Sequence, residues 1–434
     1  MEMRKKIPLS ELCLLITDGS HYSPKEEENG IPMFSVKDMG EYSFNTASAK
    51  RISEDEYQKL KRNGCEPELD DVVIAKDGSV LKHVFRVSIN EKCALLSSIA
   101  ILRPNQEIVD GEFLAYSLKN PFVQADVLAN YVSGSGVPRI VLKDFKRIPL
   151  TVPDLRTQKT IASVLHNIDR KISINLQIST SLEQIAQSIF KSWFIDFDPV
   201  KAKMAGEKLV GMDEATATLF PDSMNDSELG PIPKGWKLSQ IGDEVECVGG
   251  STPSTSNSEF WDGDICWTTP KDLSKQIGLI TTTSERRITS KGLEKISSGI
   301  LPVNSVLMSS RAPIGYLSVN AVPSAINQGF IALRQNPRFA SLYLLFWLQT
   351  NMAEIKNRAG GGTFAEISKS AFKSIPFVVP DEGILKKYDE VSEPILLQLV
   401  ALTLQNQKLV ELRDSLLPRL ISGELQIPEE MLVP

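Results

Sequence analysis

Apolar residues recur with a seven-residue period along two long stretches of the chain. The first stretch covers residues 157–194 and contains no proline, and the second covers residues 385–421. At about 1.5 Å per residue, each stretch would form a helix roughly 55 Å long, which is longer than a small domain needs for its own packing. The pattern predicts two long helices that pack on each other as a coiled coil, with kinks or an end at Pro394 and Pro418.

The heptad frame also predicts which residues form the contact between the helices. Its a positions include Ile161, Ile168, Asn175, Leu182, Ile189, Ile395, Leu402, Leu409 and Leu416. A polar residue at one a position sets the register of a coiled coil. Asn175 is therefore either such a register residue or an exposed asparagine.

The two helices belong to an internal repeat. An offset of 227 residues aligns residues 134–194 with residues 361–421, so that Phe145 recurs as Phe372. The residues before each aligned segment share little beyond polar Gly/Ser loops and short apolar runs. The chain is thus two copies of a unit with a variable front and a similar back, and antiparallel helices would relate the copies by a pseudo-twofold axis.

The variable fronts have a mixed α/β pattern. Short β-rich runs bounded by Gly, Asn and Pro occur at residues 71–75, 95–102, 305–308 and 330–333, whereas residues 112–131 and 340–358 have helical spacing. We therefore expect an α/β fold in which two α/β domains are separated by two long antiparallel coiled-coil spacer helices.

The expected boundaries follow from the repeat and from the helix pattern. They are front domain 1 at residues 1–153, the first spacer helix at 154–198, a connector at 199–225, front domain 2 at 226–380, the second spacer helix at 381–423 and a C-terminal tail at 424–434.

Charge and composition narrow the class of protein. The formal net charge is −6, and it divides into −2 for residues 1–150, −1 for 151–225, +2 for 226–380 and −5 for 381–434. A protein that bound nucleic acid by bulk charge would be basic, so any DNA binding must come from local faces or from partners. The five cysteines and three histidines lack zinc-site spacing. No apolar run approaches the roughly 20 residues of a membrane span, and we expect a cytoplasmic protein.

A search for catalytic motifs finds none. Phosphate-binding loops, dinucleotide fingerprints, zinc-protease motifs and serine-nucleophile motifs are absent from the sequence. Asp154 followed by residues 169–171 (DRK) formally matches a Mg²⁺-dependent nuclease. We reject this match because residues 169–171 lie within the heptad helix and the repeat replaces them with residues 396–398 (LLQ). We predict no catalytic residue and no metal site.

Polar loops rich in glycine are the remaining functional signal. Their backbone amides and small hydroxyls can approach phosphates, while flanking side chains reach base edges; the alternative is that they are plain turns. Arg311 could bind guanine O6 and N7 or be solvated, and Trp267 is either groove-facing or core. The candidate DNA-contacting residues are Ser20, His21, Lys76, Lys82, Ser135, Arg139, Ser251, Thr252, Thr268, Lys271, Arg311 and Thr363.

Several segments resemble one known family. Residues 191–203 (KSWFIDFDPVKAK), 219–223 (LFPDS) and 228–236 (ELGPIPKGW) form the most specific part, and residues 18–21 (DGSH) and 416–423 (LLPRLISG) add to it. Together with the order variable domain, helix, variable domain, helix, the chain resembles the specificity subunit of type I restriction-modification systems.

The resemblance implies that each front domain is a target recognition domain that reads one half of a split double-stranded DNA sequence. It also implies that two modification subunits dock on the helices, bind S-adenosylmethionine and methylate adenine N6. Restriction subunits would use ATP and Mg²⁺ to cleave. This chain would then be a non-catalytic subunit without a cofactor of its own.

A second class of function stays open on the residues alone. The near-neutral front domains are compatible with a scaffold that binds other proteins and no DNA, with helices serving only to join subunits. Binding of DNA by the chain, alone or with its modification subunits, distinguishes the two.

Overall fold

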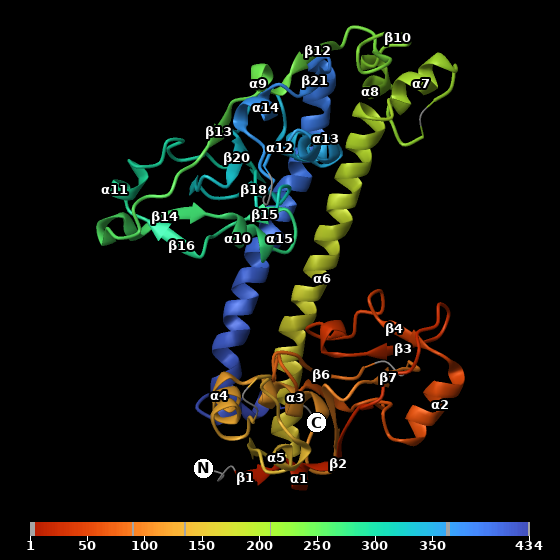
Figure 1. Ribbon diagram of the computed structural model, residues 1–434, viewed down its shortest axis with the longest axis vertical. Helices are drawn as coiled ribbons and strands as arrows, with labels where there is room; N and C mark the ends of the chain where they lie inside the picture. The colour runs from red at the N-terminus through yellow and green to blue at the C-terminus, as the bar shows by residue number, and fades with distance from the viewer. Residues whose placement is uncertain (1–4, 89–90, 134–135, 209, 362–364, 433–434) are drawn as a thin grey trace. The chain divides into compact units, whose positions relative to one another are not determined.

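The computed structural model describes residues 5–88, 91–133, 136–208, 210–361 and 365–432 (Figure 1). The chain forms two compact units. Unit 1 contains residues 1–172 and 408–434, and unit 2 contains residues 173–407. Two long helices, α6 (Leu155–Phe194) and α15 (Glu382–Ser422), each contribute residues to both units.

Front domain 1 lies in unit 1. Its strands are β1 (Lys5–Pro8), β2 (Cys13–Asp18), β3 (Ile31–Phe34), β4 (Lys50–Ile52), β5 (Val72–Ala75), β6 (Val84–Arg86), β7 (Ala94–Leu95), β8 (Ile99–Pro104) and β9 (Pro149–Val152). They form a four-stranded sheet of order β2-β8-β5-β6, a three-stranded sheet of order β4-β3-β7 and the pair β1-β9. The accompanying helices are α1 (Leu9–Leu12), α2 (Glu54–Arg62), α3 (Gly111–Lys119), α4 (Pro121–Asn130) and α5 (Leu142–Phe145).

Front domain 2 lies in unit 2. Its strands are β12 (Lys237–Gln240), β13 (Cys247–Gly249), β14 (Trp261–Thr268), β15 (Ile280–Thr281), β16 (Arg286–Ile288), β17 (Val306–Ser309), β18 (Leu317–Asn320), β19 (Ser324–Ile326), β20 (Phe330–Leu333) and β21 (Pro376–Val379). The sheets have the orders β13-β20-β17-β18-β15, β16-β14-β19 and β12-β21. The helices are α9 (Ile241–Glu244), α10 (Pro270–Ser274), α11 (Ser290–Leu293), α12 (Ser341–Thr350), α13 (Met352–Asn357) and α14 (Lys369–Lys373).

The two front domains share one topology, although their sequences share little. Strand order β2-β8-β5-β6 matches β13-β20-β17-β18, order β4-β3-β7 matches β16-β14-β19, and β1-β9 matches β12-β21; β15 is an addition in front domain 2. The repeat therefore extends through the fronts. The apolar runs predicted as strands form β5, β7, β8, β17 and β20, whose described side chains are almost all buried.

The connector contains α7 (Asp198–Met204), α8 (Glu214–Leu219) and β10 (Met224–Asn225). β10 pairs antiparallel with β11 (Ile232–Pro233), at the start of front domain 2. No helix in the described part of the chain is long and apolar enough to span a membrane.

Local sequence explains where the long helices begin and end. The Asp154 carboxylate accepts the backbone N–H of Thr157 at 3.0 Å, which caps the start of α6. Gly423 follows α15 with a φ of +82°, the left-handed conformation that favours glycine after a helix. Of the two alternatives for Pro394 and Pro418, a kink or an end, the structure excludes the end, because α15 continues through both residues.

The long helices pack antiparallel within each unit. In unit 1, Ile161 and Leu165 of α6 share a core with Leu417 and Leu420 of α15. In unit 2, Phe194 lies 5.1 Å from Tyr388, centroid to centroid. Residues later in α6 therefore contact residues earlier in α15. The two helices are antiparallel, as expected for the spacer.

The seam is less uniform than the heptad frame. Ile161, Ile168, Asn175 and Leu402 are buried, whereas the a positions that are only half-buried are Leu182, Ile189, Ile395, Leu409 and Leu416. Leu396 and Leu417 are buried beside Ile395 and Leu416. The contact on α15 is therefore displaced by one residue at these two places, since a straight helix drifts relative to a strict heptad.

Asn175 lies in the seam of unit 2. Its Nδ2 donates to Gln405 Oε1 at 2.7 Å and to Asn406 Oδ1 at 2.8 Å, and the residue is fully buried. Because these partners come from the facing helix, the contact supports the register interpretation over an exposed asparagine.

A buried ion pair joins the helices in unit 1. Asp169 of α6 is 3% exposed, and its carboxylate accepts from Arg413 Nη1 of α15 at 2.9 Å and from the Tyr116 hydroxyl of α3 at 2.6 Å. Arg413 also reaches Glu41 at 3.0 Å. Asp169 therefore joins the helix pair to front domain 1.

Candidate nucleic-acid interface

Three polar segments meet at one edge of front domain 1. They are the turn after β2, the residues after β5 and the loop that contains residues 133 and 136–139. The turn is tied down by Ser20 N–H, which donates to Leu95 O at 2.7 Å. Lys76 N–H donates to Ser98 O at 2.9 Å, and its carbonyl accepts from Ile140 N–H at 3.0 Å. Backbone hydrogen bonds thus bring together segments that the sequence separates widely.

Front domain 2 builds the same junction. Ser251 N–H donates to Ile326 O at 3.2 Å, Ser310 N–H donates to Gly329 O at 2.8 Å, and Ile367 N–H donates to Ser310 O at 3.1 Å. These bonds correspond one by one to those in front domain 1. The polar loops singled out in the two halves are therefore the same structural site, which we call the loop junction. Its described residues are 18–22, 76–82, 133 and 136–139 in unit 1, and 249–252, 310–315, 360–361 and 365–366 in unit 2.

One glycine in each loop junction is required by close packing. A Cβ added to Gly19 would lie 2.2 Å from Leu95 O, and one added to Gly250 would lie 1.9 Å from Ile326 O. Any side chain would push the turn away from the neighbouring strand. These glycines are thus structural, and they set the position of the hydroxyls and charges that follow them.

Lys76 corrects one expectation about front domain 1. Only 8% of its side chain is exposed, and its ammonium lies 3.2 Å from Asp18 and 3.5 Å from Asp77. It therefore neutralises carboxylates beneath the loops and does not point into a groove. His21 lies 3.7 Å from Asp18 with 78% of its side chain exposed, and Arg139 is exposed on the facing loop.

The loop junctions carry opposite charges at matching positions. In unit 1, Asp77 forms a backbone bridge with Arg139, and in unit 2, Arg311 forms the corresponding bridge with Glu366. Arg311 Nη1 is 3.6 Å from Glu366, and 36% of the arginine side chain is exposed. The two junctions therefore present different chemistry on one backbone frame.

The remaining candidates differ in access. Lys82 and Thr252 are exposed, and exposed Lys271 pairs with Glu285 at 2.9 Å. The Ser20 hydroxyl is used within its own turn, where it bonds the backbone of Tyr22. The Ser251 hydroxyl donates to Lys295 O and accepts from Ser297 N–H. Ser135 and Thr363 lie outside the described residues.

Thr268 is a second correction. It is fully buried at the end of β14, and its hydroxyl has no hydrogen-bond partner among the described residues. Trp267 is 5% exposed and belongs to the core, which was one of its two interpretations.

Sequence reasoning missed a basic pair on the edge strand of each three-stranded sheet. Lys50 and Arg51 of β4 correspond to Arg286 and Arg287 of β16, because Met33 pairs with Lys50 as Trp267 pairs with Arg286. The available signal was the short match of residues 50–52 (KRI) with residues 286–288 (RRI).

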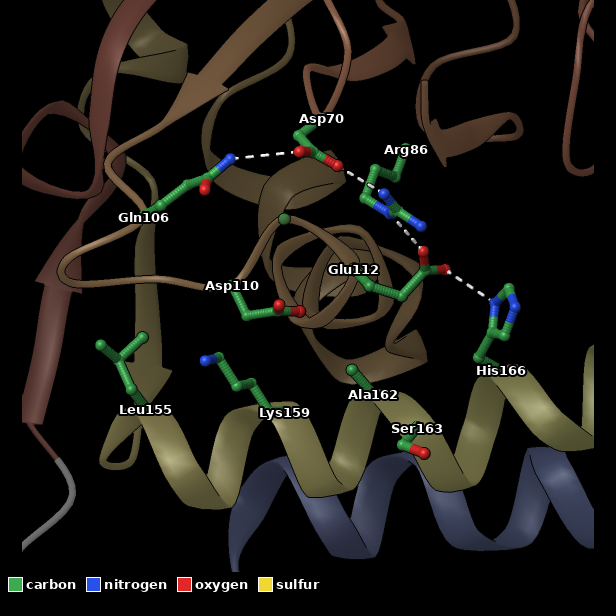
Figure 2. A pocket seen from close by; sticks show the side chains of 11 residues that line it. Asp70, Arg86, Gln106, Asp110, Glu112, Leu155, Lys159, Ala162, Ser163 and His166 are labelled. Atoms are coloured by element: carbon green, nitrogen blue, oxygen red, sulfur yellow. Dashed lines mark hydrogen bonds and ion pairs between the residues drawn. The ribbon is translucent and has the colours of Figure 1, made fainter. Parts of the chain in front are cut away.

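A separate polar cleft of about 440 Å³ lies between α3 and α6 in unit 1 (Figure 2). Arg86 Nε lies 2.6 Å from Glu112 and its Nη1 pairs with Asp70, while His166 lies 3.6 Å from Glu112. Arg86 thus pairs with both the Asp70 and the Glu112 carboxylates in this cleft. Among the described residues, no cluster of His, Cys, Asp or Glu is suited to hold a metal ion.

Comparison with known proteins agrees with this geometry. The chain is 29% identical to the type I restriction enzyme HindI specificity subunit of Haemophilus influenzae, over 75% of this chain and 80% of the relative. It is 38% identical to the type I restriction enzyme MjaIX specificity subunit of Methanocaldococcus jannaschii, over 39% of this chain and 41% of the relative.

A solved structure shows the same fold. The type I restriction-modification S subunit from M. genitalium has a TM-score of 0.57 at 15% identity, covering 99% of both chains. The family model for the type I restriction modification DNA specificity domain matches residues 3–184 and 233–412, one match for each copy of the repeat. The chain therefore belongs to the type I restriction-modification DNA specificity family.

Proposed function

We propose that this chain reads a bipartite double-stranded DNA sequence, with one half read by each front domain. The observation that carries the proposal is the repeated loop junction, which uses equivalent backbone hydrogen bonds in both units but presents different side chains. A repeated frame with variable side chains suits two sites that bind the same polymer and read different bases. We expect Arg139, Lys82 and His21 to contribute in unit 1, and Arg311, Thr252 and Lys271 in unit 2.

The long helices set the distance between the two half-sites in this proposal. α6 is one uninterrupted helix of 40 residues and α15 one of 41 residues, each shared by both units. Inserting seven residues into each helix at facing positions keeps the seam in phase. The gap between half-sites should then grow by up to about three base pairs, since seven residues add about 10 Å.

The chemistry belongs to partner subunits. We propose that two modification subunits carry S-adenosylmethionine and methylate adenine, and that restriction subunits use ATP and Mg²⁺. A docking surface is available in unit 2, where Ile174, Ile178 and Ile185 of α6 are 39%, 40% and 50% exposed. On α15, Leu397 is 60% exposed and Leu404 is 40% exposed. Large exposed apolar side chains on long helices are typical of protein interfaces.

The proposal is tested with the full chain and its co-encoded modification subunit. Methylome sequencing of cells that carry both should find one bipartite motif, and the purified complex should bind that duplex more tightly than a scrambled one. The chain alone, supplied with S-adenosylmethionine, ATP and Mg²⁺, should neither methylate nor cut DNA. A complex that binds no DNA would favour the protein scaffold suggested by the near-neutral front domains.

A further inference from the structure

The edge strands β4 and β16 offer the clearest difference between the two front domains. The second residue of each basic pair has the same structural task. Arg51 Nη1 donates to Gly30 O at 3.0 Å, and Arg287 Nη1 donates to Asp264 O at 2.9 Å. In each half the carbonyl lies two positions before the residue that pairs with the arginine, Pro32 or Cys266. This arginine therefore holds the edge strand in both halves.

The first residue of each pair has different surroundings. In unit 1, Lys50 Nζ donates to Ser23 Oγ at 2.9 Å and to the carbonyl of Pro24. The ammonium of Lys50 therefore holds the loop at residues 23–24, which follows the loop junction. In unit 2, the corresponding loop is held by tryptophans. Trp261 Nε1 donates to Ser254 O at 3.0 Å, and Trp267 Nε1 donates to Ser251 O at 3.2 Å.

In front domain 2 the tryptophan N–H groups hold the loop that Lys50 holds in front domain 1. The matching cation, Arg286, is therefore not needed to hold the loop. Arg286 is exposed, and its guanidinium makes no hydrogen bond or ion pair with any residue that the structure describes. The guanidinium carbon lies 3.4 Å from the ring centre of Trp261 and 5.8 Å from that of Trp267. The two rings are buried and meet edge to face, 5.0 Å apart at 85°.

This packing fixes the guanidinium before any ligand arrives. A cation over an indole face is attracted by the ring, and an arginine stacked on an aromatic ring keeps its donor fork in one plane. Because both indoles are anchored through their N–H groups to the backbone of residues 251–254, the fork is held beside the loop junction. A preorganised fork loses little entropy on forming two hydrogen bonds.

We propose that Arg286 is a specificity-determining residue that donates a pair of hydrogen bonds to O6 and N7 of a guanine in the half-site of front domain 2. This rests on the proposed function, because it assumes that front domain 2 reads DNA. Phosphate contact needs only a mobile positive charge, whereas a guanine edge needs two parallel donors in a fixed plane.

The test uses the full chain in complex with its modification subunit. Arg286→Gln should make one guanine position of one half-site degenerate in the methylome and leave the other half-site and the gap unchanged. Discrimination against a substitution at that base pair should fall by about 5- to 150-fold, the range for one bidentate contact. Arg286→Lys, which keeps the charge and lacks the fork, should also relax that position.

Lys291→Gln is the matched control. It removes one positive charge from an exposed lysine of the same front domain and should leave the motif intact. An unchanged motif in both Arg286 variants would overturn the proposal, as would a half-site for front domain 2 that contains no guanine. A uniform loss of affinity with a smaller salt dependence would assign Arg286 to a phosphate and also overturn it. A wild-type complex without any bipartite motif would instead contradict the proposed function itself.

Discussion

The two front domains use one backbone frame for different side-chain chemistry. A buried Lys76 neutralises Asp18 and Asp77 in unit 1, whereas the matching position in unit 2 is the uncharged Ser310. The long helices also have a charged pair in unit 1 where unit 2 has apolar residues. The 227-residue offset relates Asp169 and Arg413 of unit 1 to Leu396 and Ala186 of unit 2, both of which lie in an apolar core.

This contrast shows which features the frame requires. Backbone hydrogen bonds and one tightly packed glycine recur in each junction, so they define the frame. The Lys76 ammonium, the Asp169–Arg413 ion pair and the stacking of Arg286 on tryptophan do not recur in the other unit, so these features are free to differ between the units. The comparison can be tested by moving features from one unit to the other.

The largest effect is expected from the ion pair in unit 1. Arg413→Ala leaves the Asp169 carboxylate buried without its cation and should destabilise the protein by about 3–5 kcal/mol. The double variant Asp169→Leu with Arg413→Ala imports the apolar pair of unit 2. It should cost less than the single variant, because the buried carboxylate that Arg413→Ala leaves unpaired is also removed. Thermal unfolding of the three proteins decides this, and a double variant less stable than Arg413→Ala would contradict the comparison.

A second prediction concerns the shared glycine. Gly250→Ala forces a methyl group against Ile326 O and should destabilise unit 2 by about 1–3 kcal/mol. It should also weaken DNA binding through the half-site of front domain 2. Gly249→Ala is the matched control, because its Cβ would meet only Phe330 O at 3.6 Å. Equal melting temperatures for the two variants would show that the close approach is not required.

The smallest effect is expected at Glu183 of α6. Burial raises the pKa of Glu183, partly offset by the N–H of Leu279, which donates to its carboxylate at 3.2 Å. A raised pKa in the folded state means that stability is lost as pH rises through the unfolded and then the folded pKa.

Glu183→Gln should therefore raise the melting temperature slightly at pH 7. The gain should disappear at a pH below the ordinary glutamate range, where both states of the wild-type carboxyl are protonated. Val410, the matching residue of unit 1, already lacks a charge. An equal shift at both pH values would mean that the charge of Glu183 is not the cause.

Much of the architecture follows from local patterns. Heptads predicted α6 and α15, and the glycine loops marked segments that do meet in each loop junction. The burial of Lys76 was not predictable, because its partner Asp18 arrives from β2 through sheet pairing. The basic pair at Arg286 was missed for a related reason. Its meaning depends on Trp261, which comes close only when β14 and β16 pair.

The shared topology of the front domains could also not be predicted from the pattern of apolar and polar residues. Strand order depends on which segments pair, and this can be kept while nearly every side chain changes. Functional assignment of single residues in the junctions stays a prediction for the same reason.

The most direct test of the account replaces residues 1–153 with the corresponding front domain of a relative that has a different target. Methylome sequencing of cells with this chimera and the modification subunit reads both halves and the gap at once. Independent readout by two front domains on helical spacers predicts one new half-site, with the other half-site and the gap unchanged. A methylated motif with both halves altered, or with neither altered, would contradict it.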